Sequence, residues 1–305
     1  MKAIKTLIAT AAAALVATSA QADIKIGVIL PLTGPASGLG IPAKNQVELW
    51  PTSIAGEKLQ VTILDDATDP TNGVRIARRF TTEDKVDLIV GSVATPVGVA
   101  IADVARDTKT PQLALTPIGL PPGADAWSFR MPQSNGVMAT AIINHMKDKG
   151  IKTVGFLGYT DAYGEQWLQA FSPLAEKAGI KIVGVERFAR TDTSVTGQAL
   201  KLVAAKPDAM LIVASGSGAA MPHKGIVERG FKGTIYQTHG AASKDLMRVG
   251  GKDVEGAYVV AGPVIAPSQL PDSNPSKAVA LDFSQKYDQK DGAGEKEDRC
   301  HRRRS

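Results

Sequence analysis

Short apolar runs rich in Val and Ile recur along this chain and alternate with segments of helical periodicity. Each run has the length and composition of a buried strand, and the intervening segments carry residues that begin and end helices. The alternation predicts an α/β fold in which parallel sheets are covered by helices on both faces. The predicted strands are Ile24–Leu30, Leu59–Leu64, Val86–Val90, Gln112–Leu115, Thr153–Leu157, Ile182–Val185, Ala209–Val213, Thr234–Tyr236 and Ala257–Val260. The predicted helices are Val74–Phe80, Val97–Asp107, Ser134–Lys149, Gly164–Ala178, Thr196–Ala205, Pro222–Glu228 and Ser276–Lys290.

The alternation pauses twice, at residues 129–136 and 261–275, where proline and polar residues collect. We interpret these pauses as crossings between two lobes. The predicted division is a first lobe over residues 23–130, a second lobe over residues 131–262 and a return to the first lobe over residues 263–290. Residues 291–305 have no apolar periodicity and end in a basic cluster, which predicts a disordered tail.

The first 22 residues have the pattern of a secretory signal. A basic start precedes an apolar run over residues 7–17, and Ala20-Gln21-Ala22 fits the small-x-small cleavage pattern. The alternative, a transmembrane helix, needs a longer apolar run than this one. We therefore predict a cleaved signal peptide over residues 1–22 and export of the remainder.

Charge and aromatic content argue against a nucleic-acid partner. The net charge is +5, but six of the basic residues lie in the first five and last seven positions, so the body between them is close to neutral. Aromatic residues make up 5% of the chain, too few for base-stacking surfaces. Asp65-Asp66 and Asp69 could bind a metal, yet their place between a strand and a helix favours turn and N-cap roles. The single cysteine, Cys300, excludes an internal disulfide, and the four histidines lack metal-site spacing, so no metal or other cofactor is predicted.

The loops that follow the predicted strands form the candidate ligand site, because ligands of open parallel sheets lie beyond the carboxyl ends of the strands. The strongest candidate is Ser92–Pro96, where a strand ends and a helix with free N–H groups and hydroxyls begins, able to receive a carboxylate. Thr116 offers a second hydroxyl one strand later. The alternative for Thr95 is a plain N-cap. The other loops selected are Pro35–Gly40, Thr116–Gly119, Gly158–Gly164, Ser215–Ala220 and Thr238–Ala241.

Two patterns are similar to enzyme signatures, and both are weak. Residues 38–43 read G-x-G-x-x-A, a dinucleotide fingerprint, but begin eight residues after the strand ends at Leu30, too far for that motif's tight turn. Asp161 and His239 could join a serine in a hydrolytic triad, but no G-x-S-x-G elbow supports it. A dehydrogenase is therefore disfavoured, and an exported hydrolase stays a minor alternative.

Five stretches of the chain match a known family in order: DIKIGVILPLTGPASGLG, LDDATDPTNGVRIARRF, GYTDAYGEQWL, ERFARTDTSVTGQALKL and THGAASKDLMRVGG. Together they resemble the periplasmic solute-binding proteins of ABC importers in the branched-chain amino acid class, over roughly residues 24–290. The resemblance implies a type I periplasmic binding protein, a monomer whose two Rossmann-like lobes with parallel sheets are joined by a hinge. It also implies a small-molecule carboxylate ligand, no catalysis, and an inner-membrane permease and ATPase as partners. A ligand-sensing protein that reports to a receptor is the alternative.

The chain departs from the family pattern after residue 290. Family members continue there, completing the first lobe and making a third crossing, whereas residues 291–305 read as unrelated sequence. The resemblance therefore implies a truncated or frame-shifted member, in which folding and activity are open questions.

The resemblance also assigns ligand contacts. Tyr163 corresponds to a tyrosine that lines the family's pocket, and Leu39 corresponds to a ligand contact from the first loop. The two loops that contain Thr95 and Thr116 correspond to the loops that bind the ligand carboxylate in the family. The full predicted ligand-binding set is Ser37, Leu39, Ala94, Thr95, Ala114, Thr116, Asn135, Tyr159, Asp161, Tyr163, Ser215, Ala219 and His239.

Two positions in that set bear on the class of ligand. Amino-acid-binding members of the family place an acid just before the glycine that aligns with Gly240, and here that residue is His239. A second family acid aligns best with Asn135. Burying an unpaired ammonium costs several kcal/mol, and one lost charged hydrogen bond forfeits about 1.5–3 kcal/mol. With small residues at Ala219 and Ala220 to leave room, the sequence predicts an aromatic or other non-amino carboxylic acid.

Overall fold

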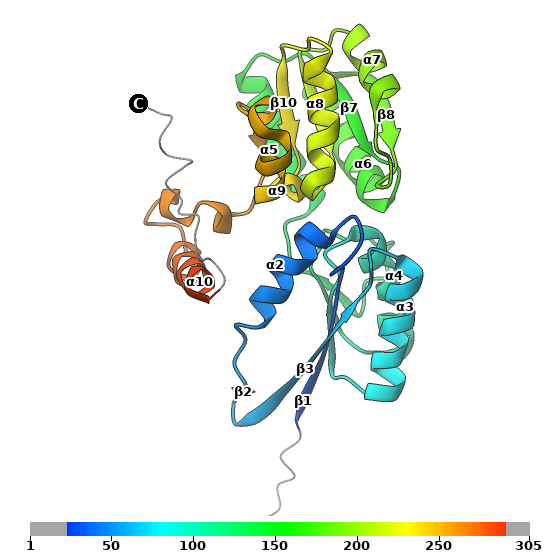
Figure 1. Ribbon diagram of the computed structural model, residues 1–305, viewed down its shortest axis with the longest axis vertical. Helices are drawn as coiled ribbons and strands as arrows, with labels where there is room; N and C mark the ends of the chain where they lie inside the picture. The colour runs from blue at the N-terminus through cyan, green and yellow to red at the C-terminus, as the bar shows by residue number, and fades with distance from the viewer. Residues whose placement is uncertain (1–22, 291–305) are drawn as a thin grey trace, which may run out of the picture.

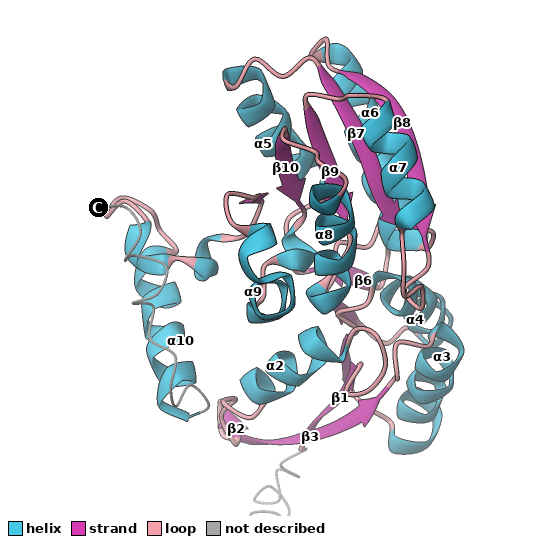
Figure 2. Ribbon diagram, turned by 45° about the horizontal axis from the view of Figure 1, so that its top comes forward, coloured by secondary structure: helices cyan, strands magenta, loops and turns pink. Residues whose placement is uncertain are grey.

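Residues 23–290, which a computed structural model describes, form two α/β lobes that lie end to end (Figure 1). Each lobe is built on one sheet, its strands parallel except for one short hairpin, and helices pack against the sheets (Figure 2). The predicted fold class is therefore confirmed. The predicted signal peptide, residues 1–22, and the predicted tail, residues 291–305, lie outside the described residues.

The first lobe is built on a six-stranded sheet. Its elements are β1 (Ile24–Leu30), α2 (Ser37–Val47), β2 (Ser53–Ile54), β3 (Glu57–Asp65), α3 (Pro70–Arg79), η1 (Phe80–Asp84), β4 (Leu88–Gly91), α4 (Thr95–Thr108), β5 (Gln112–Ala114) and β6 (Ser128–Arg130). The strand order is β2-β3-β1-β4-β5-β6, and β1 pairs with β3 on one edge and β4 on the other. This central place explains why β1 is apolar and is buried from Ile26 onward.

The second lobe is built on a five-stranded parallel sheet in the order β11-β10-β9-β7-β8. Its elements are α5 (Asn135–Asp148), β7 (Thr153–Tyr159), α6 (Ala162–Lys177), β8 (Lys181–Phe188), α7 (Thr196–Ala204), β9 (Ala209–Val213), α8 (Ala220–Glu228), β10 (Thr234–Gln237), α9 (Lys244–Gly250) and β11 (Tyr258–Val259). All five residues of the middle strand β9 are buried. Trp167 and Phe171 of α6 are fully buried and belong to the same core as β9.

The loops after β1 and β3 are held by the acids predicted there. Asp69 caps α3, its Oδ1 accepting from the backbone N–H of Thr71 at 2.7 Å and of Asn72 at 3.3 Å. Asp65 accepts from the backbone N–H of Leu32 at 2.8 Å and so ties the end of β3 to the end of β1. The turn and N-cap interpretation of these acids is therefore confirmed.

Regular structure extends into two segments that the sequence predicts as irregular, the loop Pro35–Gly40 and the crossing over residues 129–136. Helix α2 begins at Ser37, so the G-x-G-x-x-A run at residues 38–43 lies inside a helix and not in a strand-to-helix turn. Its Gly40 lies against β1, since a Cβ there would lie 2.0 Å from the carbonyl oxygen of Pro31. The predicted first crossing, residues 129–136, contains most of β6. Because β6 is an edge strand and Phe129 is 54% exposed, it lacks the buried apolar run that marks the other strands.

After β11 the chain passes through short turns to α10 (Lys277–Lys290), which lies at the side of the first lobe (Figures 1 and 2). Within α10 Ala280 is buried, whereas Val279 is 72% exposed. Lys290 Nζ donates to the backbone oxygen of Glu48, just past α2, at 2.6 Å.

The predicted lobe boundaries stay predictions. None of the helices between residues 23 and 290 has both the length and the apolar character to span a membrane.

Candidate functional site

The loops at the carboxyl ends of the two sheets meet at the junction of the lobes (Figure 1). Gln166 of α6 pairs with the backbone of Gly119, in the loop that follows β5: its Oε1 accepts from Gly119 N at 3.0 Å, and its Nε2 donates to Gly119 O at 3.1 Å. On the other side Gly38 of α2 approaches Asp245 of α9, and a Cβ on Gly38 would lie 2.2 Å from Asp245 Oδ2. Two loops selected from the sequence in the first lobe, Pro35–Gly40 and Thr116–Gly119, thus face helices of the second lobe at this junction.

In the first lobe the structure brings Thr95 and Thr116 together. Their hydroxyl oxygens lie 2.5 Å apart, and both side chains are buried. Ala94 is the N-cap of α4 and Thr95 is its first helical residue, so the plain N-cap interpretation of Thr95 is wrong. The preceding loop is held by Ser92, whose Oγ accepts from Ala94 N at 3.1 Å and donates to Asp66 Oδ2 at 2.7 Å. Burial raises the pKa of Asp66.

The other first-lobe residues of the predicted set occupy buried or half-buried positions. Ala114 ends β5 and is fully buried, and its carbonyl oxygen accepts from Met131 N at 3.0 Å. Ser37 and Leu39 lie in the first turn of α2 and are half-buried. No side-chain hydrogen bond between either of them and Thr95 or Thr116 occurs in the described structure.

In the second lobe the structure assembles a cluster of rings. The Tyr163 hydroxyl lies 2.7 Å from Thr238 Oγ1 and accepts from Gly240 N at 3.3 Å. The His239 ring lies 5.6 Å from the Tyr163 ring and stacks on Trp167 at 6.0 Å between centroids. Burial raises the pKa of Tyr163 far above its ordinary value, so its hydroxyl stays protonated.

Arg190 lies at this cluster and was missed from the sequence. Its Nε donates to Asp161 Oδ2 at 2.5 Å and its Nη1 to Ser215 Oγ at 3.0 Å. Its guanidinium carbon lies 4.1 Å from the centroid of the Tyr159 ring, a cation–π distance. Arg190 follows β8, which ends at Phe188, and the loop after that strand was not among those selected. Applying the carboxyl-end rule to every strand would have found it.

The hydrolytic triad does not assemble. The Asp161 carboxylate caps α6, accepting from Tyr163 N at 2.9 Å, and pairs with Arg190. Ser215 accepts from the same arginine. The His239 ring packs on Tyr163 and Trp167, and its buried Nδ1 makes no hydrogen bond to a serine within residues 23–290.

His239 and Asn135 bring no negative charge to the site. Burial lowers the pKa of His239 to about 4, so its ring is neutral at pH 7. Its buried Nδ1 has no hydrogen-bond partner within residues 23–290, and the same holds for the buried Oδ1 of Asn135. Asn135 is the first residue of α5, following the cap Ser134, and no hydrogen bond joins its side chain to the ring cluster in the described chain.

Ala219 and Ala220 are fully buried, so neither borders open space in this structure. The carbonyl oxygen of Ala219 accepts from Gln237 Nε2 at 3.2 Å. A Cβ on the preceding Gly218 would lie 2.3 Å from the Tyr159 hydroxyl, which shows how closely this turn packs on that ring.

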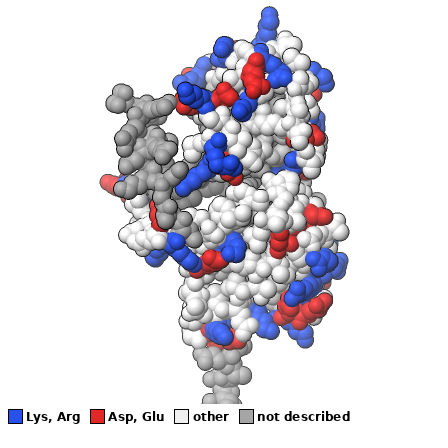
Figure 3. Space-filling view, viewed as in Figure 1, with Lys and Arg blue, Asp and Glu red and all other residues white. Residues whose placement is uncertain are grey.

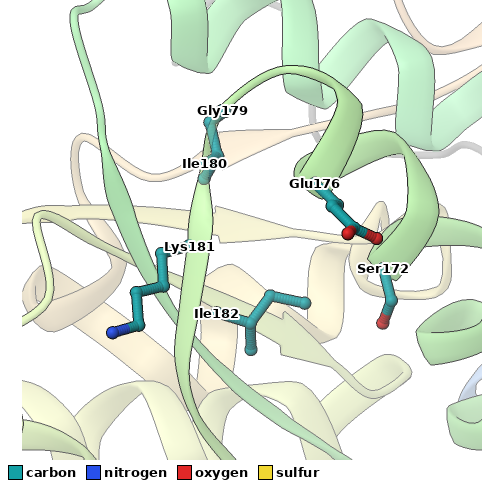
Figure 4. Close-up of a pocket in the computed structure, with 6 residues that line it drawn as sticks. All are labelled: Ser172, Glu176, Gly179, Ile180, Lys181 and Ile182. Carbon is teal, nitrogen blue, oxygen red and sulfur yellow. The ribbon is translucent and has the colours of Figure 1, made fainter.

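A surface pocket lies at the opposite edge of the second sheet. Its lining residues come from the end of α6 and the start of β8 (Figure 4). They are Ser172, Glu176, Gly179, Ile180, Lys181 and Ile182. Because β8 begins here, the pocket adjoins the amino edge of the sheet, away from the ring cluster.

Within the described residues no group of three or more His, Cys, Asp or Glu side chains could hold a metal. On the face in Figure 3, acidic and basic side chains are interspersed over both lobes.

Comparison with known proteins gives matches over most of the chain. The sequence profile of the family described as periplasmic binding protein matches residues 23–296. An extracellular ligand-binding receptor from Rhodopseudomonas palustris HaA2 is 46% identical with a TM-score of 0.86, over 88% of this chain and 75% of that one. The Leu/Ile/Val-binding protein homolog 3 of Brucella melitensis is 28% identical over 254 residues, which cover 79% of this chain and 67% of that protein.

A more distant structure shares the fold alone. It is a solute-binding protein of an ABC transporter from Rhodopseudomonas palustris BisB5, in complex with 3,4-dihydroxybenzoic acid. It is 24% identical with a TM-score of 0.75, over 88% of this chain and 74% of that one. The chain spans about two thirds of the length of the first curated relatives that it matches.

Proposed function

Because the chain belongs to the periplasmic binding protein family, in the branched-chain amino acid class, we propose that it binds a small carboxylate without an amino group at the junction of its lobes. In this proposal the protein works in the periplasm, catalyses no reaction, and delivers its ligand to the permease and ATPase of an ABC importer. Family membership supports the solute-binding role, and the residues at the junction support the class of ligand.

The observation that carries the ligand class is the lack of an available acid among the predicted contacts. A buried α-ammonium needs a carboxylate partner, because an unpaired buried charge costs several kcal/mol. Asp161 is the one acid in the predicted set, and its carboxylate is already engaged by Arg190 and by the first turn of α6. His239 is neutral and Asn135 carries no charge. Among the predicted contacts, none would therefore pair with the ammonium of an amino acid, and the nearby carboxylate of Asp245 is already paired with Arg248 at 2.8 Å.

The carboxylate of the ligand would find suitable hydrogen-bond donors in the first lobe. Thr95 and Thr116 present adjacent hydroxyls at the N-terminus of α4, and a hydroxyl can donate to a carboxylate. The unpaired N–H groups and the dipole of that helix end favour an anion by about 0.3–1 kcal/mol. This pair supports a ligand oriented with its acid toward the first lobe.

The opposite side supports an aromatic body. The rings of Tyr159, Tyr163 and His239 form one cluster, beside which the guanidinium of Arg190 lies 4.1 Å from the Tyr159 ring. An aromatic ligand at this side would pack on uncharged rings while Arg190 keeps its pairing with Asp161. Burying about 150–250 Å² of such a ligand would contribute about 4–6 kcal/mol at about 25 cal/mol/Å². With the carboxylate of the ligand held by the two hydroxyls, we expect a Kd of about 1 μM, which corresponds to a binding free energy of about −8 kcal/mol.

Equilibrium dialysis against radiolabelled benzoate tests the proposed function. We expect the protein to retain benzoate in stoichiometric amounts and to return it chemically unchanged. Methyl benzoate and benzamide, incubated in parallel, should be recovered intact. Failure to retain any benzoate would contradict the proposed ligand class. Release of benzoate from the ester above the buffer rate, lost in a Ser215→Ala variant, would instead indicate a hydrolase.

A further inference from the structure

Two contacts join the lobes through residues other than the hydroxyl and ring clusters. One is the pairing of Gln166 with Gly119, and the other is the approach of Asp245 to Gly38. In each contact a side chain of the second lobe meets a glycine of the first. The two contacts involve different helices of the second lobe, α6 and α9, so they hold the junction at two separate points.

The Gln166 contact pairs one amide with one peptide unit. The side-chain oxygen accepts from Gly119 N and the side-chain nitrogen donates to Gly119 O, as two strands do in a sheet. A Cβ on Gly119 would lie 3.3 Å from the Gln166 amide, tighter than ordinary packing, so glycine permits this approach. Gly119 is exposed and Gln166 is half-buried, so water can replace both hydrogen bonds when the lobes separate.

The Asp245 contact places a carboxylate, which also pairs with Arg248 at 2.8 Å, at the start of α2. Helix α2 has no side-chain cap and no acid in its first turn. Asp245 Oδ2, reaching from the second lobe, lies against Gly38 in that turn, where the helix dipole favours a negative charge. Apart from the chain neighbours of Gly38 and the backbone of α2, Asp245 is the only described residue with atoms within 4 Å of a Cβ placed on that glycine. A side chain at this position would therefore obstruct the approach of Asp245 and no other packing between the lobes.

We propose that the Gln166–Gly119 and Asp245–Gly38 contacts form an interlobe latch that sets ligand affinity without touching the ligand. In this proposal the contacts form only when the lobes are closed, so they shift the balance between open and closed forms. The apparent Kd of a ligand equals its intrinsic Kd divided by the fraction of competent protein. When the closed form is the minor one, a tenfold fall in the fraction of closed protein raises the apparent Kd tenfold, which equals about 1.4 kcal/mol. The affinity part of this proposal rests on the proposed function, whereas the closure part does not.

The first test compares Gln166→Ala with Gln169→Ala, a matched control on the exposed side of the same helix. Two measurements are made on each variant: the benzoate Kd by calorimetry and the interlobe distance by double electron–electron resonance. Spin labels at Arg78→Cys and Leu200→Cys report on the two lobes, in a Cys300→Ser background that removes the single native cysteine. We expect Gln166→Ala to weaken benzoate binding about tenfold and to move the distance distribution to longer values. Gln169→Ala should match the parent chain in both measurements.

The second test replaces Gly38 by leucine. Leucine favours a helix over glycine, so α2 itself is not weakened and the thermal midpoint should not fall. We expect the short-distance population and benzoate binding to disappear together. Unchanged distances and Kd in both Gln166→Ala and Gly38→Leu would overturn the latch. If the parent chain binds no benzoate, the ligand class fails, and the distance measurement alone still decides the latch.

Discussion

The His239→Asp variant is expected to bind leucine about ten- to hundredfold more tightly than the parent chain, since a charged hydrogen bond contributes about 1.5–3 kcal/mol. The substitution places a carboxylate just before Gly240, where it can pair with the ligand ammonium. The same carboxylate should weaken benzoate binding, because two anions would then share one buried site. Calorimetry with leucine and benzoate measures both changes.

The matched control for this variant is His239→Asn. Asparagine has nearly the shape of aspartate and no charge, so it separates the effect of the acid from that of removing a ring. We expect His239→Asn to gain no leucine affinity. Equal leucine affinities in the Asp and Asn variants would show that the charge at this position does not select the ligand.

Stability should fall as the pH is lowered from about 6.5 to about 4 because of His239. Burial holds the pKa of its folded state at about 4, whereas the unfolded chain has the ordinary value of 6.5. Between these values the unfolded state binds the extra proton, so stability rises with pH across this window and is lost toward acid. The full loss is about 3 kcal/mol, since one pKa unit corresponds to about 1.36 kcal/mol.

Urea denaturation at pH 7, 6, 5 and 4 measures this effect. His239→Asn removes the titrating group, so its stability should decline less between pH 6.5 and 4 than that of the parent chain. Asp66 has the opposite effect. Burial raises its pKa, so its contribution to the stability of the folded chain is lost as the pH rises through that raised value. Asp66 is present in both proteins, so the difference between them isolates His239. Parallel declines in the two proteins would contradict a buried neutral histidine.

The fold is well predicted where burial and sequence pattern agree. Strand β1 occupies the predicted residues because it is central in its sheet and apolar along most of its length. The start of α2 was predicted too late, after a loop over Pro35–Gly40, because Gly38, Gly40 and Pro42 are residues of loops by composition. Contacts that are distant in sequence override that tendency: Gly40 packs on Pro31, and Gly38 faces the second lobe. Strand β6 was missed because a three-residue edge strand needs little apolar sequence.

The candidate site was predicted where residues follow neighbouring strands and was missed where the contacts depend on the folded chain. Thr95 and Thr116 follow neighbouring strands, and the rule for parallel sheets places such residues together without further information. Arg190 was missed because the loop after β8 was not selected, and the folded chain shows that its side chain binds Asp161 and Ser215. The neutral state of His239 also needed the structure, since burial and not sequence lowers its pKa.

The central claim is that this site accepts a carboxylate and rejects an α-ammonium. Leucine and 4-methylpentanoate make the sharpest comparison, because they differ only in that group. Calorimetry of both ligands with the same protein should give a Kd for 4-methylpentanoate at least about a hundredfold lower, since the unpaired ammonium of leucine costs several kcal/mol. Tight binding of leucine, with 4-methylpentanoate bound weakly or not at all, would contradict the account.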